Sequence, residues 1–359
     1  MIALLMLLAH AEEVDPVELA ALLLRDGHAE RAAATLAEID PDDPPEDLAR
    51  WQTVRGLVAT ETGNHATAAA AFREALTARA SEPVITVYLG RELLALDQPA
   101  EALAVLTAEE LAATWVLRAR SLRALDRNDA AYDALIGGSE RFADDPVLLR
   151  DRALFLAEHG LVRPLEELQP AVLATGRVDD ALAIAAALRP TDPRAAALWL
   201  EALRLQHDDP RIPVHLAAAW IAAGEPRAAG QVLLVAAEAD PSLFVAAARA
   251  FEQADDIDRA LYANQRVVEP RDKARQRLGL LVAAARYDEA LALLPRLERL
   301  GMLSEDRVAY AVAYAHFQIG ERQAASTRLD GIADAEVFRL ATGLRQAIAA
   351  CEEAPWSCR

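Results

Sequence analysis

The side chains best suited to binding another molecule are arginines that recur along the chain. A guanidinium group offers five N–H donors in a planar fork and binds carboxylates through paired hydrogen bonds. In the repeat frame described below, five of them fall just past a small residue or one helical turn from it: Arg91, Arg120, Arg123, Arg249 and Arg275. Such a stripe suits a carboxylate-bearing peptide or an anionic glycan. The alternative is that arginine, the commonest cation here, only occupies polar surface.

A second candidate site is aromatic. Tyr310, Tyr314 and Phe317 share one face of a helix because their spacings are 4 and 3. On the inner surface of a helix pair these side chains would anchor a partner. A shift of one residue would instead bury them against the next pair, and both interpretations stay open at this point.

Catalytic and metal-binding patterns are not found in the sequence. The 7 histidines stand singly, and there is no Gly-rich phosphate loop, Gly-x-Ser-x-Gly turn or cysteine placed as a nucleophile. Acidic runs at 40–43 and 255–258 do not match a calcium loop, and aspartate at a turn usually caps the following helix. We therefore expect a protein that is not an enzyme and that binds no cofactor and no metal.

Composition and charge limit the fold and the partners. The formal charge of −19 disfavours extended contact with nucleic acid or an anionic membrane, since such contacts need many cations. Hydrophobic residues make up 53% of the chain but aromatic residues only 5%, so alanine and leucine dominate, and both favour helices. No sustained apolar/polar alternation predicts a strand. These features predict an all-α protein.

The two ends of the chain carry signals of export. Residues 1–11 form an apolar run ending in Ala9-His10-Ala11, similar to a signal peptide cleaved after Ala11, although no cation precedes it. The alternative is a first helix of the array. The run is too short to span a bilayer as a helix, so no integral membrane segment is expected after its removal. Cys351 and Cys358 would form a disulfide in an oxidising compartment; free thiols are the alternative.

Tandem repeats must position these candidates. From Gly56 the sequence places Ala68 after 12 residues, Phe72 after 4 more and Ala75 after another 3. Small residues let two helices cross closely, and the larger ones fill the seam with the next pair. The first two positions of this frame recur as Ala20 and Ala32, Gly90 and Ala102, Ala119 and Ala131, Ala217 and Ala229, Ala248 and Ala260, Leu278 and Ala290, and Ala313 and Ala325.

Several sequence segments that fit this frame resemble the tetratricopeptide-repeat family. Residues 286–291 (Arg-Tyr-Asp-Glu-Ala-Leu) and 224–233 are similar to its turn and second helix, and Trp115 and Leu89-Gly90 match its first helix. The resemblance covers about residues 13–335 and implies a right-handed α-solenoid of helix-turn-helix units, with a concave groove lined by the first helices.

The resemblance also gives the expected domain boundaries. After a signal peptide at 1–11, the array spans 12–335 and is irregular around 146–209. Residues 336–351 form a capping helix that covers the apolar end of the array, and residues 352–359 form a tail.

A member of this family would be a non-catalytic scaffold that binds a protein or peptide partner in its groove. With the export signal, we expect a periplasmic or secreted protein. One alternative is a periplasmic component of exopolysaccharide export that handles an anionic glycan, and another is a cytoplasmic adaptor. Chaperone-binding members clamp a terminal carboxylate with Lys and Asn, but this chain has a single lysine, Lys273, so that activity is not expected.

Overall fold

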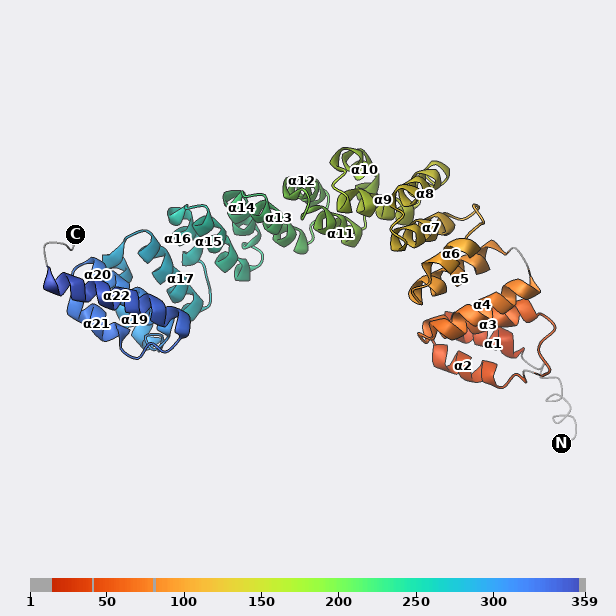
Figure 1. The fold of residues 1–359 in the computed structure, drawn as a ribbon, viewed down its shortest axis with the longest axis horizontal. Helices are drawn as coiled ribbons and strands as arrows, with labels where there is room; N and C mark the ends of the chain where they lie inside the picture. Colours follow the sequence, from red (N-terminus) through yellow and green to blue (C-terminus); the bar gives the residue numbers. More distant parts are fainter. Residues whose placement is uncertain (1–14, 41, 80–81, 355–359) are drawn as a thin grey trace, which may run out of the picture. The chain divides into compact units, whose positions relative to one another are not determined.

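The computed structural model describes residues 15–40, 42–79 and 82–354. The predicted signal peptide at residues 1–11 and the predicted disulfide partner Cys358 lie outside these ranges. Within them the chain forms α-helices and one short 3-10 turn, with no strand (Figure 1). Consecutive helices pack against each other in pairs, which confirms the predicted all-α fold of helix-turn-helix repeats. No described helix is long and apolar enough to cross a lipid bilayer.

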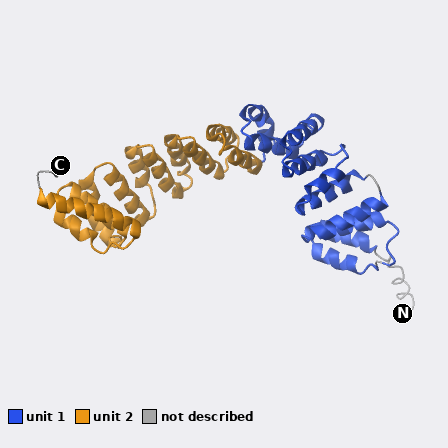
Figure 2. Ribbon diagram, in the orientation of Figure 1, with its two compact units in different colours: residues 1–177 blue, residues 178–359 orange. Residues whose placement is uncertain are grey.

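The helices divide into two compact units, residues 1–177 and 178–359 (Figure 2). In unit 1, first helices of successive pairs contact one another: α1 contacts α3, α5 contacts α7 and α7 contacts α9. Its helices are α1 (Pro16–Arg25), α2 (Ala29–Ala37), α3 (Leu48–Glu61), α4 (His65–Ala78), α5 (Pro83–Ala95), α6 (Pro99–Val105), α7 (Ala112–Ala124), α8 (Asn128–Arg141), α9 (Pro146–Glu158) and α10 (Val162–Ala174).

Unit 2 continues the pairing and ends in a long helix that packs on α20 and α21. Its elements are α11 (Val178–Leu188), α12 (Pro193–Arg204), α13 (Arg211–Ala222), α14 (Pro226–Ala236), η1 (Pro241–Leu243), α15 (Phe244–Gln253), α16 (Ile257–Gln265), α17 (Pro270–Ala283), α18 (Tyr287–Leu291), α19 (Leu294–Arg299), α20 (Asp306–Gln318), α21 (Arg322–Leu329) and α22 (Ala335–Glu353). The boundary between the units falls inside the region 146–209, where the repeat frame is irregular.

A small residue on the first helix meets a large residue on the second. A Cβ added to Gly56 of α3 would lie only 2.5 Å from Cε1 of Phe72 on α4, and one added to Gly90 would lie 2.7 Å from Cδ2 of Leu106. Both contacts join residues 16 positions apart. The two backbones therefore approach so closely that no side chain fits at the first position.

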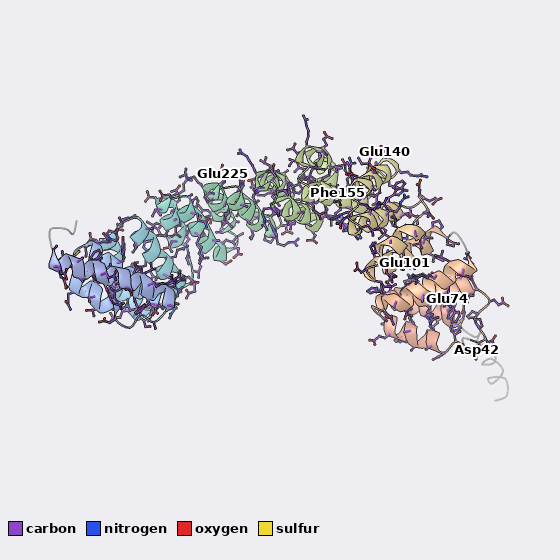
Figure 3. The ribbon with its side chains drawn as sticks, in the orientation of Figure 1. Asp42, Glu74, Glu101, Glu140, Phe155 and Glu225 are labelled. Carbon is purple, nitrogen blue, oxygen red and sulfur yellow. The ribbon has the colours of Figure 1, made fainter. Side chains whose placement is uncertain are left out.

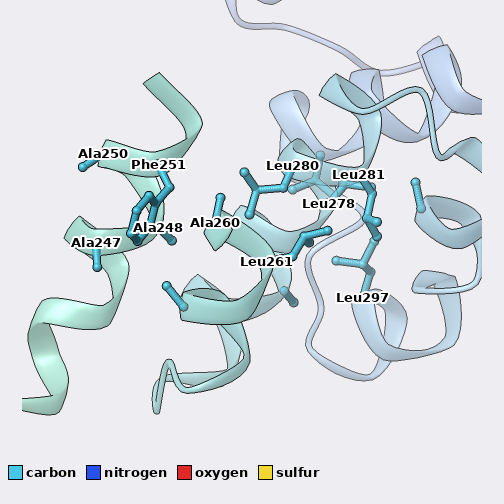
Figure 4. Close-up of a cluster of buried hydrophobic side chains, with 14 of the residues drawn as sticks. Ala247, Ala248, Ala250, Phe251, Ala260, Leu261, Leu278, Leu280, Leu281 and Leu297 are labelled. Atoms are coloured by element: carbon cyan, nitrogen blue, oxygen red, sulfur yellow. The ribbon is translucent and has the colours of Figure 1, made fainter. Parts of the chain in front are cut away.

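The same spacing recurs in the buried clusters of the other pairs. In four other pairs, the small residue and the large residue 16 positions later belong to the same buried cluster. These are Ala20 and Leu36, Ala119 and Leu135, Ala217 and Leu233, and Ala313 and Leu329. Figure 4 shows Leu278, Leu281 and Leu297 together in one buried cluster of unit 2. The frame that begins at Gly56 is thus a packing frame.

The pair formed by α15 and α16 has a polar residue where the other pairs of this frame have a large apolar one. Asn264 lies 16 residues after Ala248 and is fully buried, where other pairs have a leucine or phenylalanine. Its Nδ2 donates to the carbonyl oxygen of Lys273 at 3.0 Å and to Oε1 of Gln276 at 3.2 Å. These bonds tie α16 to α17 and offset part of the cost of burying the amide, whose Oδ1 has no hydrogen-bond partner among the described residues.

The turns use left-handed backbone and side-chain caps. Gly63 has φ of 74° at the α3–α4 turn, and Asn64 then accepts a hydrogen bond from the backbone N–H of Thr67. Asp255 adopts the same region with φ of 56°, and Asp256 accepts from the N–H of Arg259. The acidic run at 255–258 therefore ends one helix and caps the next.

The terminal helix α22 buries fewer of its regularly spaced apolar side chains than its sequence indicates. Val337, Leu344 and Ile348 are buried, but Leu340, which also fits the apolar spacing, is 52% exposed. Arg345 of the same helix donates from Nη2 to the carbonyl oxygen of Leu329 at 2.5 Å. Contact with α20 and α21 is therefore confined to one edge of the helix.

The close contact of Gly56 with Phe72 gives a prediction about stability. Gly56→Ala should lower the free energy of unfolding by about 1–3 kcal/mol, because Phe72 must move from a well-packed position. In the matched variant Gly279→Ala, the new methyl group meets nothing within 4 Å on α17, so a gain of about 0.5–1 kcal/mol is expected. Urea denaturation followed by circular dichroism measures both; equal effects would contradict the packing frame.

Candidate partner-binding surface

All five predicted arginines lie on the first helix of a pair. Arg91 is on α5 and Arg120 and Arg123 are on α7, all in unit 1, whereas Arg249 on α15 and Arg275 on α17 belong to unit 2. The expected repeat position is therefore observed for each of them. Whether they bind a partner depends on what surrounds each guanidinium group.

Arg91, Arg120 and Arg123 border two adjacent hollows in unit 1. We call the surface that lines these two hollows the arginine strip. One hollow of about 210 Å³ is lined by Val87, Arg91, Ala113, Val116, Leu117, Arg120, Asp145 and Val147. A second, of about 520 Å³, is lined by Arg120, Arg123, Ala124, Asn128 and His159. Because Arg120 lines both hollows, they lie side by side along α7.

A buried carboxylate holds Arg120 in place. Nε of Arg120 donates to Oδ2 of Asp151 at 2.6 Å, and Nη2 donates to Oδ1 at 3.0 Å. Arg150 donates to the same Oδ1 from Nε at 3.1 Å and from Nη2 at 2.8 Å. Asp151 is only 5% exposed, whereas the side chain of Arg120 is 41% exposed. One buried negative charge thus faces two guanidinium groups.

The neighbouring arginines differ in their pairing. Arg123 forms an ion pair with Glu158 and lies over the ring of Phe155, which also stacks on His159 with ring centroids 4.2 Å apart (Phe155 is labelled in Figure 3). Arg91 lies over the ring of Tyr88 at 5.8 Å, and no ion pair joins it to another described residue. Arg91 is therefore the arginine of the strip whose charge no described carboxylate pairs with, whereas Arg120 and Arg123 are held by Asp151 and Glu158.

This positive strip contrasts with the rest of the exterior. Glu101, Glu140 and Glu225 are exposed on other helices (Figure 3), in keeping with the formal charge of −19. A local positive surface on an acidic protein selects for acidic ligands, because the surrounding charge repels them elsewhere.

The other two predicted arginines line neither hollow. Arg275 donates to Oδ1 of Asp272 at 2.9 Å and to Oε2 of Glu305 at 3.0 Å, so it links α17 to the start of α20. Arg249 is exposed on α15. The structure therefore brings together three of the five arginines and leaves these two apart.

The predicted aromatic site takes part in helix packing. Tyr310, Tyr314 and Phe317 are half-buried against the core formed by α20, α21 and α22. Tyr314 also meets Tyr287 of α18 edge-on, with ring centroids 6.1 Å apart, and burial raises the pKa of Tyr310. These contacts account for the three side chains, and a docking role for them stays a prediction.

The predicted disulfide is also untested. Cys351 is buried on α22, and its predicted partner Cys358 lies outside the described residues.

Three residues that hold the arginines of the strip in place were not predicted from the sequence. They are Asp151, Arg150 and Glu158. Asp151 follows Arg120 by 31 residues and Glu158 follows Arg123 by 35, separations close to one repeat. Opposite charges at the repeat spacing are therefore the signal that would have found them.

Comparisons with known proteins found similar solved structures but no matching family. No protein-family model matches it, and no curated protein matches its sequence. A crystal structure of PilW, a type IV pilus biogenesis factor, is 19% identical and covers 53% of this chain and 91% of its own, with a TM-score of 0.44. The C-terminal part of a TPR repeat-containing protein from Cytophaga hutchinsonii is 13% identical and covers 79% of this chain and 97% of its own, also with a TM-score of 0.44.

A third similar structure is a tetratricopeptide repeat protein from Parabacteroides merdae. It is 12% identical and covers 75% of this chain and 98% of its own, with a TM-score of 0.35. Two of these three neighbours are thus named as proteins of the family that the sequence resembles. The helix pairs of the chain itself define the class: an all-α helical-repeat protein.

The carboxylate of Asp151, which Arg120 and Arg150 share, gives a prediction about the stability of unit 1. Asp151→Ala should lower the free energy of unfolding by about 1–3 kcal/mol, since two adjacent guanidinium groups lose their common partner. Arg120→Ala should cost less, because Arg150 still neutralises Asp151. Asp258→Ala, at a side chain 97% exposed, should change stability by less than about 0.5 kcal/mol. Urea denaturation compares the three variants, and an Asp151→Ala protein as stable as the parent would rule out this arrangement.

Proposed function

We propose that the protein is a non-catalytic scaffold and that its arginine strip binds an acidic, partly apolar segment of a protein partner. The observation that carries the proposal is the single buried carboxylate of Asp151 between two arginines. It fixes the guanidinium group of Arg120 at the meeting point of two hollows, and Arg91, which has no ion pair with another described residue, supplies positive charge beside it. A group held in this way is already oriented to bind a carboxylate, so less conformational entropy is lost on binding.

The lining favours a peptide over a sugar. Val87, Val116, Leu117 and Val147 form apolar walls beside Arg91 and Arg120. An acidic peptide with intervening aliphatic side chains matches both features. An anionic glycan would match only the charge, because the ring of Tyr88 is already covered by Arg91 and that of Phe155 by Arg123. Glycan handling therefore remains the second candidate.

Site-directed cross-linking tests the proposal in cells that produce the protein. A benzophenone amino acid in place of Ala113, an exposed residue of the smaller hollow, should form a discrete adduct with a partner protein. Adding Arg91→Glu should abolish the adduct, because it reverses an exposed charge without breaking an ion pair. Arg249→Glu, the matched change at an exposed arginine outside the hollows, should leave the adduct intact.

Two outcomes would count against the strip as the binding surface. An adduct that survives Arg91→Glu would mean that the partner lies near Ala113 for another reason. Retention of the purified protein on an acidic polysaccharide at low salt, lost in Arg91→Glu, would favour the glycan candidate instead.

We also propose that the protein is exported, with the periplasm as the expected compartment and the cytoplasm as the alternative. Support comes from the apolar run at 1–11 and its Ala9-His10-Ala11 ending. Sequencing the N-terminus of the native protein should then give Glu12 as the first residue. A protein that keeps Met1 would contradict export by this signal.

A further inference from the structure

Unit 2 contains a groove that lies away from all the predicted sites. It occupies about 800 Å³ beside α12, α13 and α14, and we call it the unit 2 groove. Its apolar lining comes from Leu205, Trp220, Val232, Val235, Ala236 and Ala239. A hollow of this size with mainly apolar walls is suited to a protein segment.

Two aliphatic side chains of this groove face the solvent. Leu205, at the end of α12, is 80% exposed, and Val235, on α14, is 61% exposed. Single exposed aliphatic residues are common on protein surfaces. Here, however, both border the same apolar hollow, with Trp220 between them in the chain, and an apolar face that is rimmed by polar residues is typical of an interaction site.

The polar rim of the unit 2 groove is acidic. It carries the carboxylates of Glu201, Asp208 and Asp209 and one guanidinium group, that of Arg204. Arg204 donates from Nε at 2.9 Å and from Nη2 at 2.7 Å to Oε2 of Glu201, so this cation is already neutralised.

The two aspartates of the rim differ in their contacts. Hydrogen bonds from Arg211 lower the pKa of Asp209 to about 2, so this carboxylate is ionised at neutral pH. Asp208 is exposed, and no ion pair joins it to another described residue. Because Arg204 and Arg211 already pair with Glu201 and Asp209, the rim favours a positively charged ligand through the exposed carboxylate of Asp208.

We propose that the unit 2 groove binds an amphipathic helix of a protein partner, with its apolar face on Leu205, Trp220 and Val235 and its basic side chains toward Asp208. The secondary structure of the groove favours a helix over a strand. The apolar walls formed by Trp220, Val232 and Val235 are helical, so their backbone groups are already paired and a bound strand would find no ladder of hydrogen bonds there, whereas a helix satisfies its own backbone.

A second copy of this chain is a poorer occupant. Two copies each carry a formal charge of −19 and repel one another, and the rim adds further negative charge at the contact. A basic helix from another protein is attracted by the same charges. This partner differs from the acidic segment proposed for the arginine strip.

The test uses the full chain and a synthetic probe, a peptide of about 18 residues made of Leu, Ala and Lys with its leucines at helical spacing. Fluorescence anisotropy should show binding of this peptide. A scrambled peptide of the same composition and a version with Glu in place of Lys should bind at least about tenfold more weakly.

Protein variants then locate the site. Leu205→Ser combined with Val235→Ser should weaken binding at least about tenfold, while Leu198→Ser, at a residue 54% exposed on α12 outside the groove, should leave it unchanged. Asp208→Lys should weaken binding by about threefold. Arg91→Glu should have no effect, which separates this groove from the arginine strip.

Three results would overturn the proposal. These are equal binding of the peptide to the double variant and the parent, equal binding of the Lys and Glu peptides, and a concentration-dependent dimer of the parent in analytical ultracentrifugation that the double variant loses. The last result would assign the groove to a second copy of the chain.

Discussion

The close contact between a small residue on one helix and a large residue 16 positions later determines how each pair is built. Gly56 against Phe72 and Gly90 against Leu106 leave no room for a Cβ, so the crossing point of the two helices is fixed. Once that point is fixed, the side chains one turn away along the first helix have fixed directions too. Arg91, which follows Gly90, and Arg120, which follows Ala119, therefore both reach the hollows beside α7.

Ion pairs at about the repeat spacing connect one pair to the next. Arg50 and Asp15 are 35 residues apart, Arg120 and Asp151 are 31 apart, and Arg211 and Asp179 are 32 apart. Exposed pairs of this kind contribute little to stability. The pair at Asp151 differs because its carboxylate is buried and shared, and this local difference separates a candidate binding residue from the many arginines that serve only as ion-pair partners.

Much of this fold could be predicted from the sequence, and less of the candidate site. The spacing from Gly56 to Phe72 identified the helix pairs because close packing restricts which residues can stand there. The positions of the five arginines followed from the same frame. Their partners did not, because a frame read from apolar residues contains no information about charges such as Asp151. The exposure of Leu205 and Val235 was likewise unpredictable, since it depends on how far α12 and α14 stand apart.

Hydrogen–deuterium exchange of the chain, free and bound to its cross-linked partner, tests the central claim most directly. If the partner lies in the arginine strip, amide exchange should slow in α5, α7 and the first turns of α9, whose residues line the hollows. Slower exchange confined to the second helices α4, α6 and α8, or an unchanged pattern throughout unit 1, would contradict it.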